Sequence, residues 1–190
     1  MFIFNAFIQS LIGLYDYAGI TGGARAARLF ALAGPEAAAE VPLSDTGDWS
    51  RYSFRGREST REYHELLREL LASLCSRLRT AVYCKTARNF RRYATEPAEL
   101  LALGPQRVTQ GIETRVSFSV SKLSAVQLTI TREGRTALDK LATFRRGSGS
   151  FAWTPRSTGS YQVRLAAKEL RSGRGLRTQT FNQIESLPAP

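Results

Sequence analysis

NAFIQSLIGLYD, residues 5–16, sets the architecture of the N-terminal half of this chain. Asn5, Gln9, Gly13 and Asp16 recur at steps of three or four, which places them on one face of a helix. Apolar residues cover most of the remaining surface, and a helix of this kind packs against neighbours on most sides. The stretch therefore predicts an inner helix of a larger helical assembly, with its few polar groups making hydrogen bonds between helices.

Further helices are predicted along the first hundred residues. One runs from residue 24 to about residue 40 and is expected to kink or restart at Pro35, which lacks an amide donor. A capping-box pattern, Ser59-Thr-Arg-Glu, places the start of another helix at about Thr60. A fourth helix is predicted over 87–93. The turn-forming residues between the second and third helices predict a loop.

After Pro105 the hydrophobic period changes from that of a helix to that of a strand. TRVSFSVS, residues 114–121, alternates apolar and polar residues, and AVQLTIT, residues 125–131, does the same. Four further short segments follow between Gly- and Ser-rich turns, over 141–144, 149–153, 161–165 and about 177–181. About seven short strands at this spacing predict a β-sandwich of immunoglobulin-like type. The predicted fold class is thus multi-domain α plus β: a helical region over 1–97, a linker over 98–105 and a sandwich over 106–190.

The positive charge of the chain is concentrated in its second half. The formal net charge is +11, of which residues 105–190 contribute +9, from 14 Lys/Arg against 5 Asp/Glu. Such a surface suits binding of an anionic polymer. A solvated surface that keeps the domain soluble would show the same excess of positive charge. Basic charge without a recognition motif is unspecific, so we expect no nucleic-acid partner.

The sequence offers little for metal binding or membrane insertion. Cys75, Cys84 and the single His64 are fewer than the four ligands of a structural zinc site, so we expect no metal and no cofactor. The two cysteines are expected to be free buried thiols, since a disulfide would need the chain to turn between them. Polar residues interrupt the apolar N-terminus and no cation precedes it, so we expect neither a transmembrane segment nor a signal peptide in this chain. Localisation stays undecided, and a longer form with a signal peptide would point to the cell envelope or exterior.

Five blocks follow one another in a recognisable order: Asn5–Asp16, Pro42–Gly47, Tyr52–Arg55, Tyr63–His64 and Phe90–Tyr93. Together they resemble the C-terminal domain of D-glucuronyl C5-epimerases, over about residues 2–100. The resemblance implies an incomplete α/α toroid and an isomerase that inverts C5 of glucuronic acid residues in heparan-type or other acidic polysaccharides.

The same resemblance implies roles for individual residues. Tyr52 and Tyr63 match catalytic tyrosines that exchange the C5 proton, and Arg55 matches an arginine that binds the uronate carboxylate. Arg51 and His64 lie beside them in the sequence and are expected to bind substrate. An arginine suits this task because its guanidinium binds a carboxylate through two parallel hydrogen bonds.

The family places a further tyrosine segment just before the position of residue 5. We therefore expect this chain to be the C-terminal portion of a longer epimerase, with doubtful activity alone. A toroid shortened to about four helices would leave Phe4, Phe7 and Leu11 uncovered.

The alternative hypothesis is a binding module without catalysis. In that case the basic second half would hold an anionic glycan or envelope polymer through cations such as Arg145, Arg146, Arg171, Arg174 and Arg177. Either hypothesis predicts an acidic polysaccharide as the partner. The sequence also leaves a homodimer open.

Overall fold

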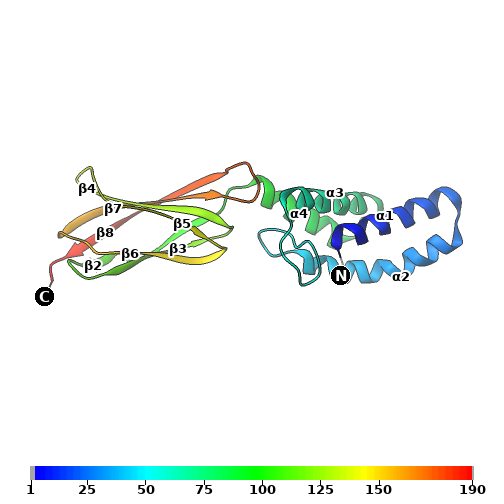
Figure 1. The fold of residues 1–190 in the computed structure, drawn as a ribbon, viewed down its shortest axis with the longest axis horizontal. Helices are drawn as coiled ribbons and strands as arrows, with labels where there is room; N and C mark the ends of the chain where they lie inside the picture. The colour runs from blue at the N-terminus through cyan, green and yellow to red at the C-terminus, as the bar shows by residue number, and fades with distance from the viewer. Residues whose placement is uncertain (1–2, 190) are drawn as a thin grey trace. The chain divides into compact units, whose positions relative to one another are not determined.

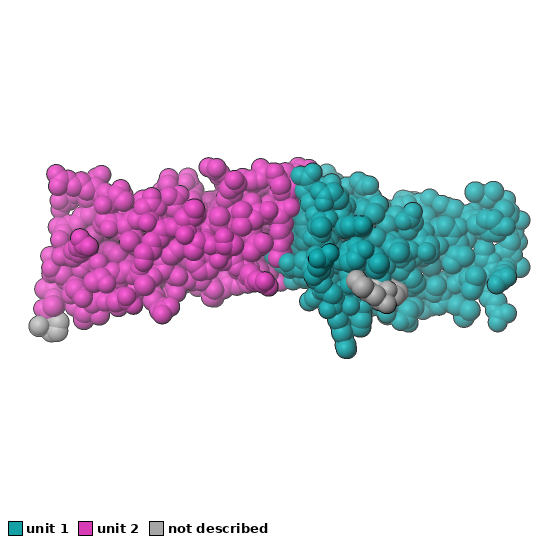
Figure 2. All heavy atoms as spheres, in the orientation of Figure 1, with its two compact units in different colours: residues 1–95 teal, residues 96–190 magenta. Residues whose placement is uncertain are grey.

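The computed structural model describes residues 3–189, and the chain forms two compact units, residues 1–95 and 96–190 (Figure 2). The first unit is helical and the second consists of strands (Figure 1). The prediction of a helical part followed by a β-sandwich is therefore confirmed. That these helices belong to an incomplete α/α toroid stays a prediction.

The helical unit consists of two helical hairpins. Its described elements are α1 (Phe4–Thr21), α2 (Ala24–Glu40), the short 3-10 helix η1 (Val41–Ser44), α3 (Arg61–Leu78) and α4 (Ala81–Thr95). Gly22 ends α1 in the left-handed region, at φ 67°, and its N–H donates to the Ala18 carbonyl at 3.0 Å. This conformation suits glycine, which lacks a Cβ, and it lets α2 fold back along α1.

The N-terminal half of α1 is the buried half. Phe4 and Leu11 are each 1% exposed, and Phe7 packs against the same core of α2, α3 and α4 residues. The expectation that these three residues lie uncovered is wrong, because the neighbouring helices already cover that face. At the other end of α1, Tyr17 and Ile20 are 59% and 84% exposed.

Three predictions about the helices differ from the observed structure. The fourth helix, predicted over 87–93, runs from Ala81 to Thr95 as α4. Helix α2 continues through Pro35 without a break. Proline removes one intrahelical donor, and the carbonyl that loses its partner belongs to Ala31; both residues are exposed, so water can solvate that carbonyl. Helix α3 has Thr60 as its N-cap, whose side chain accepts from the Tyr63 N–H at 3.5 Å, so the cap lies one residue after the predicted Ser59.

The two cysteines form a disulfide, which corrects the expectation of free thiols. Cys75 and Cys84 are linked with a Cα–Cα distance of 4.8 Å. Helix α3 ends at Leu78 and α4 begins at Ala81, so the chain turns within two residues and brings the cysteines together. The disulfide joins the two helices of the second hairpin close to their turn.

The second unit is a sandwich of two sheets, which pack across one shared core. One sheet has the strand order β1-β3-β6 and the other β2-β8-β7-β4-β5. All described pairings are antiparallel except that of β2 with β8. The strands are β1 (Leu100–Gly104), β2 (Arg107–Thr109), β3 (Thr114–Val120), β4 (Ser124–Arg132), β5 (Arg135–Phe144), β6 (Gly147–Trp153), β7 (Gly159–Glu169) and β8 (Arg177–Leu187).

The alternation of apolar and polar residues in the sequence correctly predicts which side chains of the strands face the core. Val116, Phe118 and Val120 of β3 are buried, as are the alternate apolar residues of β4 and β7. Residues 98–105, expected to be a linker, contain β1 instead, and Leu100 is buried in the sandwich core. The apolar run LLALG pairs with β3, so this segment belongs to the sandwich.

None of the helices in residues 3–189 is long and apolar enough to span a membrane.

Candidate active site

The candidate site is built on the loop between η1 and α3, residues 45–60, which Asp45 ties to α4. The Tyr93 hydroxyl donates to Asp45 Oδ1 at 3.1 Å, and Asn89 Nδ2 donates to Asp45 Oδ2 at 3.1 Å. Asp45 Oδ1 also accepts from the Gly47 N–H at 2.7 Å. Hydrogen bonds to a charged carboxylate are stronger than neutral ones, so these contacts hold the start of the loop in place.

The middle of the loop is anchored by the stacking of Trp49 on His64. Their rings lie 3.7 Å apart at an angle of 8°, and Trp49 Nε1 donates to the Ser59 carbonyl at 3.0 Å. His64 Nε2 lies 3.0 Å from the Phe90 carbonyl, which can only accept, so Nε2 carries the proton. Nδ1 then accepts from Ser50 Oγ at 2.8 Å.

Burial lowers the pKa of His64 to about 4, while the hydrogen bond to the Phe90 carbonyl acts in the opposite direction. The charged form is disfavoured because the side chain is 0% exposed and away from water. His64 is therefore a neutral imidazole at neutral pH. Both of its ring nitrogens are used inside the protein.

Tyr52 and Tyr63 come together at the N-terminal end of α1. Their ring centroids lie 4.9 Å apart and the rings meet edge to face, at 67°. The Tyr52 carbonyl accepts from the Phe4 N–H at 3.3 Å, and the Tyr63 carbonyl accepts from Asn5 Nδ2 at 3.1 Å. Helix α1 thus positions the backbone of both tyrosines, while the Tyr63 side chain remains 43% exposed.

Arg51 and Arg55 line a shallow depression together with Leu43 and Phe54. Arg51 Nη1 donates to the Gly56 carbonyl at 3.3 Å, and the Arg55 guanidinium lies 5.3 Å from the centre of the Phe54 ring. Arg55 has a φ of 54°, in the left-handed region that non-glycine residues seldom adopt. The depression therefore presents two guanidinium groups on one part of the loop.

The structure brings the predicted residues together as two separate pairs. The tyrosines contact each other and the arginines share the depression, but the residues that line the depression do not include the tyrosines. Arg51 forms an isolated antiparallel bridge with Glu58, whereas Tyr52 lies at a bend in the loop.

The structure buries His64, which is expected from the resemblance to bind substrate. Its ring lies in the core between Trp49 and Phe90 and has no exposed surface. His64 supports the site indirectly, because it binds Ser50 of the loop and the backbone of α4.

The region that contains these blocks is similar to one known family. Residues 1–92 match the family model of the D-glucuronyl C5-epimerase C-terminus. The matched region lies within the helical unit and ends inside α4, so it contains both tyrosines and both arginines. The resemblance to the epimerase C-terminus drawn from the sequence is confirmed for this part of the chain.

Two residues of the epimerase-like unit have a larger role at the site than the sequence indicated. Asn5 was expected to make packing hydrogen bonds; it is buried, and its Oδ1 has no hydrogen-bond partner among the described residues. Asp45 was interpreted as part of a turn, yet it accepts from three groups. Of the other polar residues of α1, Gln9 is exposed, and Asp16 accepts from Arg77 at 2.8 and 2.9 Å.

Within residues 3–189 there is no group of three or more His, Cys, Asp or Glu side chains that could hold a metal ion.

The comparisons with solved structures have low identities. The chain is similar to the PKD domain of an M14-like peptidase from Thermoplasmatales archaeon SCGC AB-540-F20, at 14% identity, covering 49% of this chain and 94% of that one, with a TM-score of 0.36. It is also similar to the Lin-41 filamin domain, at 15% identity, covering 47% and 91%, with a TM-score of 0.33. No curated protein matches the chain. The description of the sandwich above therefore rests on its own strands.

Proposed function

We propose that the helical unit acts in C5 epimerisation of uronic acid residues in an acidic polysaccharide. The observation that carries this proposal is the contact between Tyr52 and Tyr63, at 4.9 Å between ring centroids, in a unit that matches the epimerase C-terminus over residues 1–92. Tyr52 and Tyr63 are the proposed proton-transferring residues. Arg51 and Arg55 are the proposed carboxylate-binding residues.

The residue types suit the chemistry. Removing the C5 proton leaves an electron pair conjugated with a carboxylate that is already negative, and a guanidinium neutralises that charge. The proton passes to a phenolate oxygen, and a phenol on the opposite face of the sugar returns a proton to C5, which inverts the centre. A phenol has an ordinary pKa of about 10, so it serves as a base at neutral pH only where cations favour the phenolate.

The ring contact sets a condition on this mechanism. With centroids 4.9 Å apart, a pyranose ring does not fit between Tyr52 and Tyr63. Inversion with one tyrosine at each face therefore requires the two rings to separate when substrate enters. Tyr63 belongs to the first turn of α3, whereas Tyr52 lies on the loop, so the loop is the element that would move.

Movement of the loop would also move the arginines. Arg51 and Arg55 lie on the same loop segment as Tyr52 and flank its backbone. A uronate carboxylate bound by these arginines would therefore draw Tyr52 away from Tyr63. Substrate binding and the opening of the tyrosine pair are thus coupled in this proposal.

The test is solvent deuterium exchange into C5 of a glucuronic acid polymer, followed by NMR in D2O with the chain as the catalyst. We expect exchange with the unmodified chain and a loss of at least about 100-fold in Tyr63→Phe, which keeps the ring contact but removes the proton-transferring oxygen. Tyr52→Phe is expected to behave in the same way. Tyr17→Phe is the matched control, since Tyr17 is 59% exposed on α1 and lies outside the site.

The outcomes separate the alternatives. Equal exchange in Tyr63→Phe, Tyr52→Phe and the control would remove both tyrosines from the mechanism. Binding of the polymer by the unmodified chain without any exchange would favour the binding module over the epimerase.

A further inference from the structure

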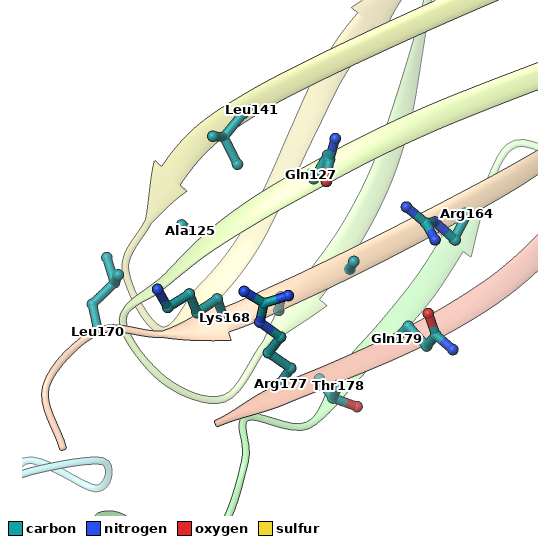
Figure 3. A pocket seen from close by; sticks show the side chains of 11 residues that line it. Ala125, Gln127, Leu141, Arg164, Lys168, Leu170, Arg177, Thr178 and Gln179 are labelled. Atoms are coloured by element: carbon teal, nitrogen blue, oxygen red, sulfur yellow. The ribbon is translucent and has the colours of Figure 1, made fainter. Parts of the chain in front are cut away.

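The outward face of the five-stranded sheet carries a row of cations over a hollow with a small-residue floor. On β7 the outward residues are Arg164, Ala166 and Lys168, since Leu165 and Ala167 between them are buried in the core. Ala125 of β4 pairs with Lys168, so it lies on the same face. The two alanines leave a depression, which Arg164, Lys168 and other residues line (Figure 3).

Two of the cations lie directly opposite each other. Lys168 of β7 pairs with Arg177 of β8, and Figure 3 shows both side chains on the same side of the sheet. Like charges at directly paired positions repel and destabilise a sheet. Among the described residues, no ion pair joins Arg164, Lys168 or Arg177 to a carboxylate.

Two acidic residues on the same sheet, Glu169 and Asp139, do not neutralise the cations. Glu169 points to the opposite side of the sheet, where it is 2% exposed and accepts from the Ser172 N–H at 2.9 Å. Asp139 lies on β5 and accepts from Gln127 Nε2 at 2.9 Å. The repulsion between Lys168 and Arg177 is therefore left for an external anion to relieve.

The rest of the hollow suits a hydroxylated ligand. Gln127 and Gln179 line it with amide groups that can donate to and accept from hydroxyls. Leu141 lines the same hollow and is 69% exposed, and Phe181, which pairs with Arg164 on the same face, is 67% exposed. Exposed apolar side chains beside amides and cations match sugar rings that carry both C–H faces and polar groups.

We infer that this face, with Arg164, Lys168 and Arg177 as its cations, is a binding surface for an acidic polysaccharide. Arg164 and Lys168 are four residues apart along the strand, which separates them by about 13 Å. The surface thus presents two groups of positive charge with neutral amides between them. A polysaccharide with carboxylates on some of its sugars and hydroxyls on the others has the same alternation.

Duplex nucleic acid fits this surface less well. It presents one negative charge per about 1.7 Å of helix axis, and its affinity comes mostly from many phosphate contacts. Three cations in two groups supply few such contacts, and the amides and apolar residues between them have no counterpart on a phosphate backbone. The proposal therefore commits to the polysaccharide.

The test measures binding of the full chain to a defined hyaluronan oligosaccharide, which carries glucuronic acid on alternate sugars, by isothermal titration calorimetry at low salt. The choice of a glucuronate probe rests on the proposed function. The inference that this face binds an acidic polysaccharide rests on the residues of the sheet alone. We expect Lys168→Gln with Arg177→Gln to weaken binding about tenfold and to reduce the salt dependence by about two charges. Carboxyl-reduced oligosaccharide is expected to bind weakly to every variant.

The matched control removes two cations elsewhere in the same unit. Arg115 lies on the other sheet and Arg156 in the loop after β6, and both are exposed. Arg115→Gln with Arg156→Gln is expected to change the affinity less than twofold. Equal weakening by the two pairs of substitutions, no binding by the unmodified chain, or tighter binding of a 20-base-pair DNA duplex would each overturn the proposal.

A further variant separates this surface from the catalytic proposal. Tyr63→Phe is expected to bind the oligosaccharide as the unmodified chain does, because Tyr63 belongs to the helical unit. The deuterium exchange of Tyr63→Phe tests only the proposed role of the tyrosines. The binding of oligosaccharide by the Lys168→Gln/Arg177→Gln variant tests only the proposed surface on the sheet.

Discussion

His64 gives the helical unit a defined dependence on pH. Its pKa in the folded protein is about 4, against an ordinary value of about 6.5 in an unfolded chain. Between these two values the unfolded state binds the extra proton, so stability rises with pH across that window. The contribution is complete above about pH 6.5, falls as the pH drops toward 4, and amounts to about 3 kcal/mol.

Urea unfolding of the protein between pH 4 and pH 8, with NMR titration of the His64 ring, measures this effect. The matched variant is His64→Gln, which can still donate to the Phe90 carbonyl but does not titrate; its stability should lose most of the slope between pH 4 and 6.5. A His64 ring that titrates near 6.5 in the folded protein would contradict the expectation.

At the level of single residues, the sequence could predict only part of the candidate site. Tyr52, Tyr63, Arg51 and Arg55 could be selected as candidates because the blocks that contain them follow the order of the family. Their contacts could not be predicted, because the loop conformation depends on Asp45 and its partners on α4. Distant hydrogen bonds of this kind leave no local pattern in the sequence.

The burial of His64, in contrast, had a signal in the sequence. His64 precedes Leu67, Leu71 and Leu74 at steps of three, four and three, and all four residues lie on the buried face of α3. Tyr63 lies one residue earlier and so faces away from that core, which agrees with its exposure. Helical periodicity separates the two neighbours, although the family motif treats them as a pair.

Among the elements, the α3–α4 hairpin depends on its disulfide. Cys75 and Cys84 are nine residues apart and close a short loop, and such a cross-link mainly restricts the unfolded chain. Cys75→Ser with Cys84→Ser is expected to lower the free energy of unfolding of the helical unit by about 2–3 kcal/mol. Chemical denaturation followed by circular dichroism at 222 nm measures the change.

The control for this prediction is a reducing agent. Reduction should shift the unfolding midpoint of the unmodified protein toward that of the double variant and leave the double variant unchanged. An unmodified protein whose unfolding midpoint is the same with and without reducing agent would contradict the stabilising role.

The boundaries of elements were less predictable than their type. Alternation in TRVSFSVS identified β3, because only one face of that strand is buried. The segment LLALG gave no such alternation, and its position beside Gly104-Pro105 favoured a linker, yet pairing with β3 makes it a strand. Tertiary pairing decides such short apolar segments, and a single sequence does not contain that information.

At the scale of the whole molecule, the helical and β units have separate hydrophobic cores. Every buried residue of one core belongs to residues 1–95, and every buried residue of the other belongs to residues 96–190. Each unit also contains one tryptophan, Trp49 in the first and Trp153 in the second. Fluorescence can therefore follow each unit separately in Trp49→Phe and Trp153→Phe backgrounds.

Two alanine substitutions test whether the cores are energetically independent. At Gly149 an added Cβ would lie 2.7 Å from both Phe118 Cζ and Phe144 Cδ1, so Gly149→Ala overpacks the sandwich core and is expected to cost about 1–3 kcal/mol. At Gly34, inside α2, an added Cβ meets nothing within 4 Å, so Gly34→Ala should stabilise the helical unit by about 0.5–1 kcal/mol. The first substitution should shift only the transition reported by Trp153, and the second only that reported by Trp49. A shift of both transitions by either substitution would mean that the two units unfold as one, because a cost confined to one core reaches the other only when their unfolding is coupled.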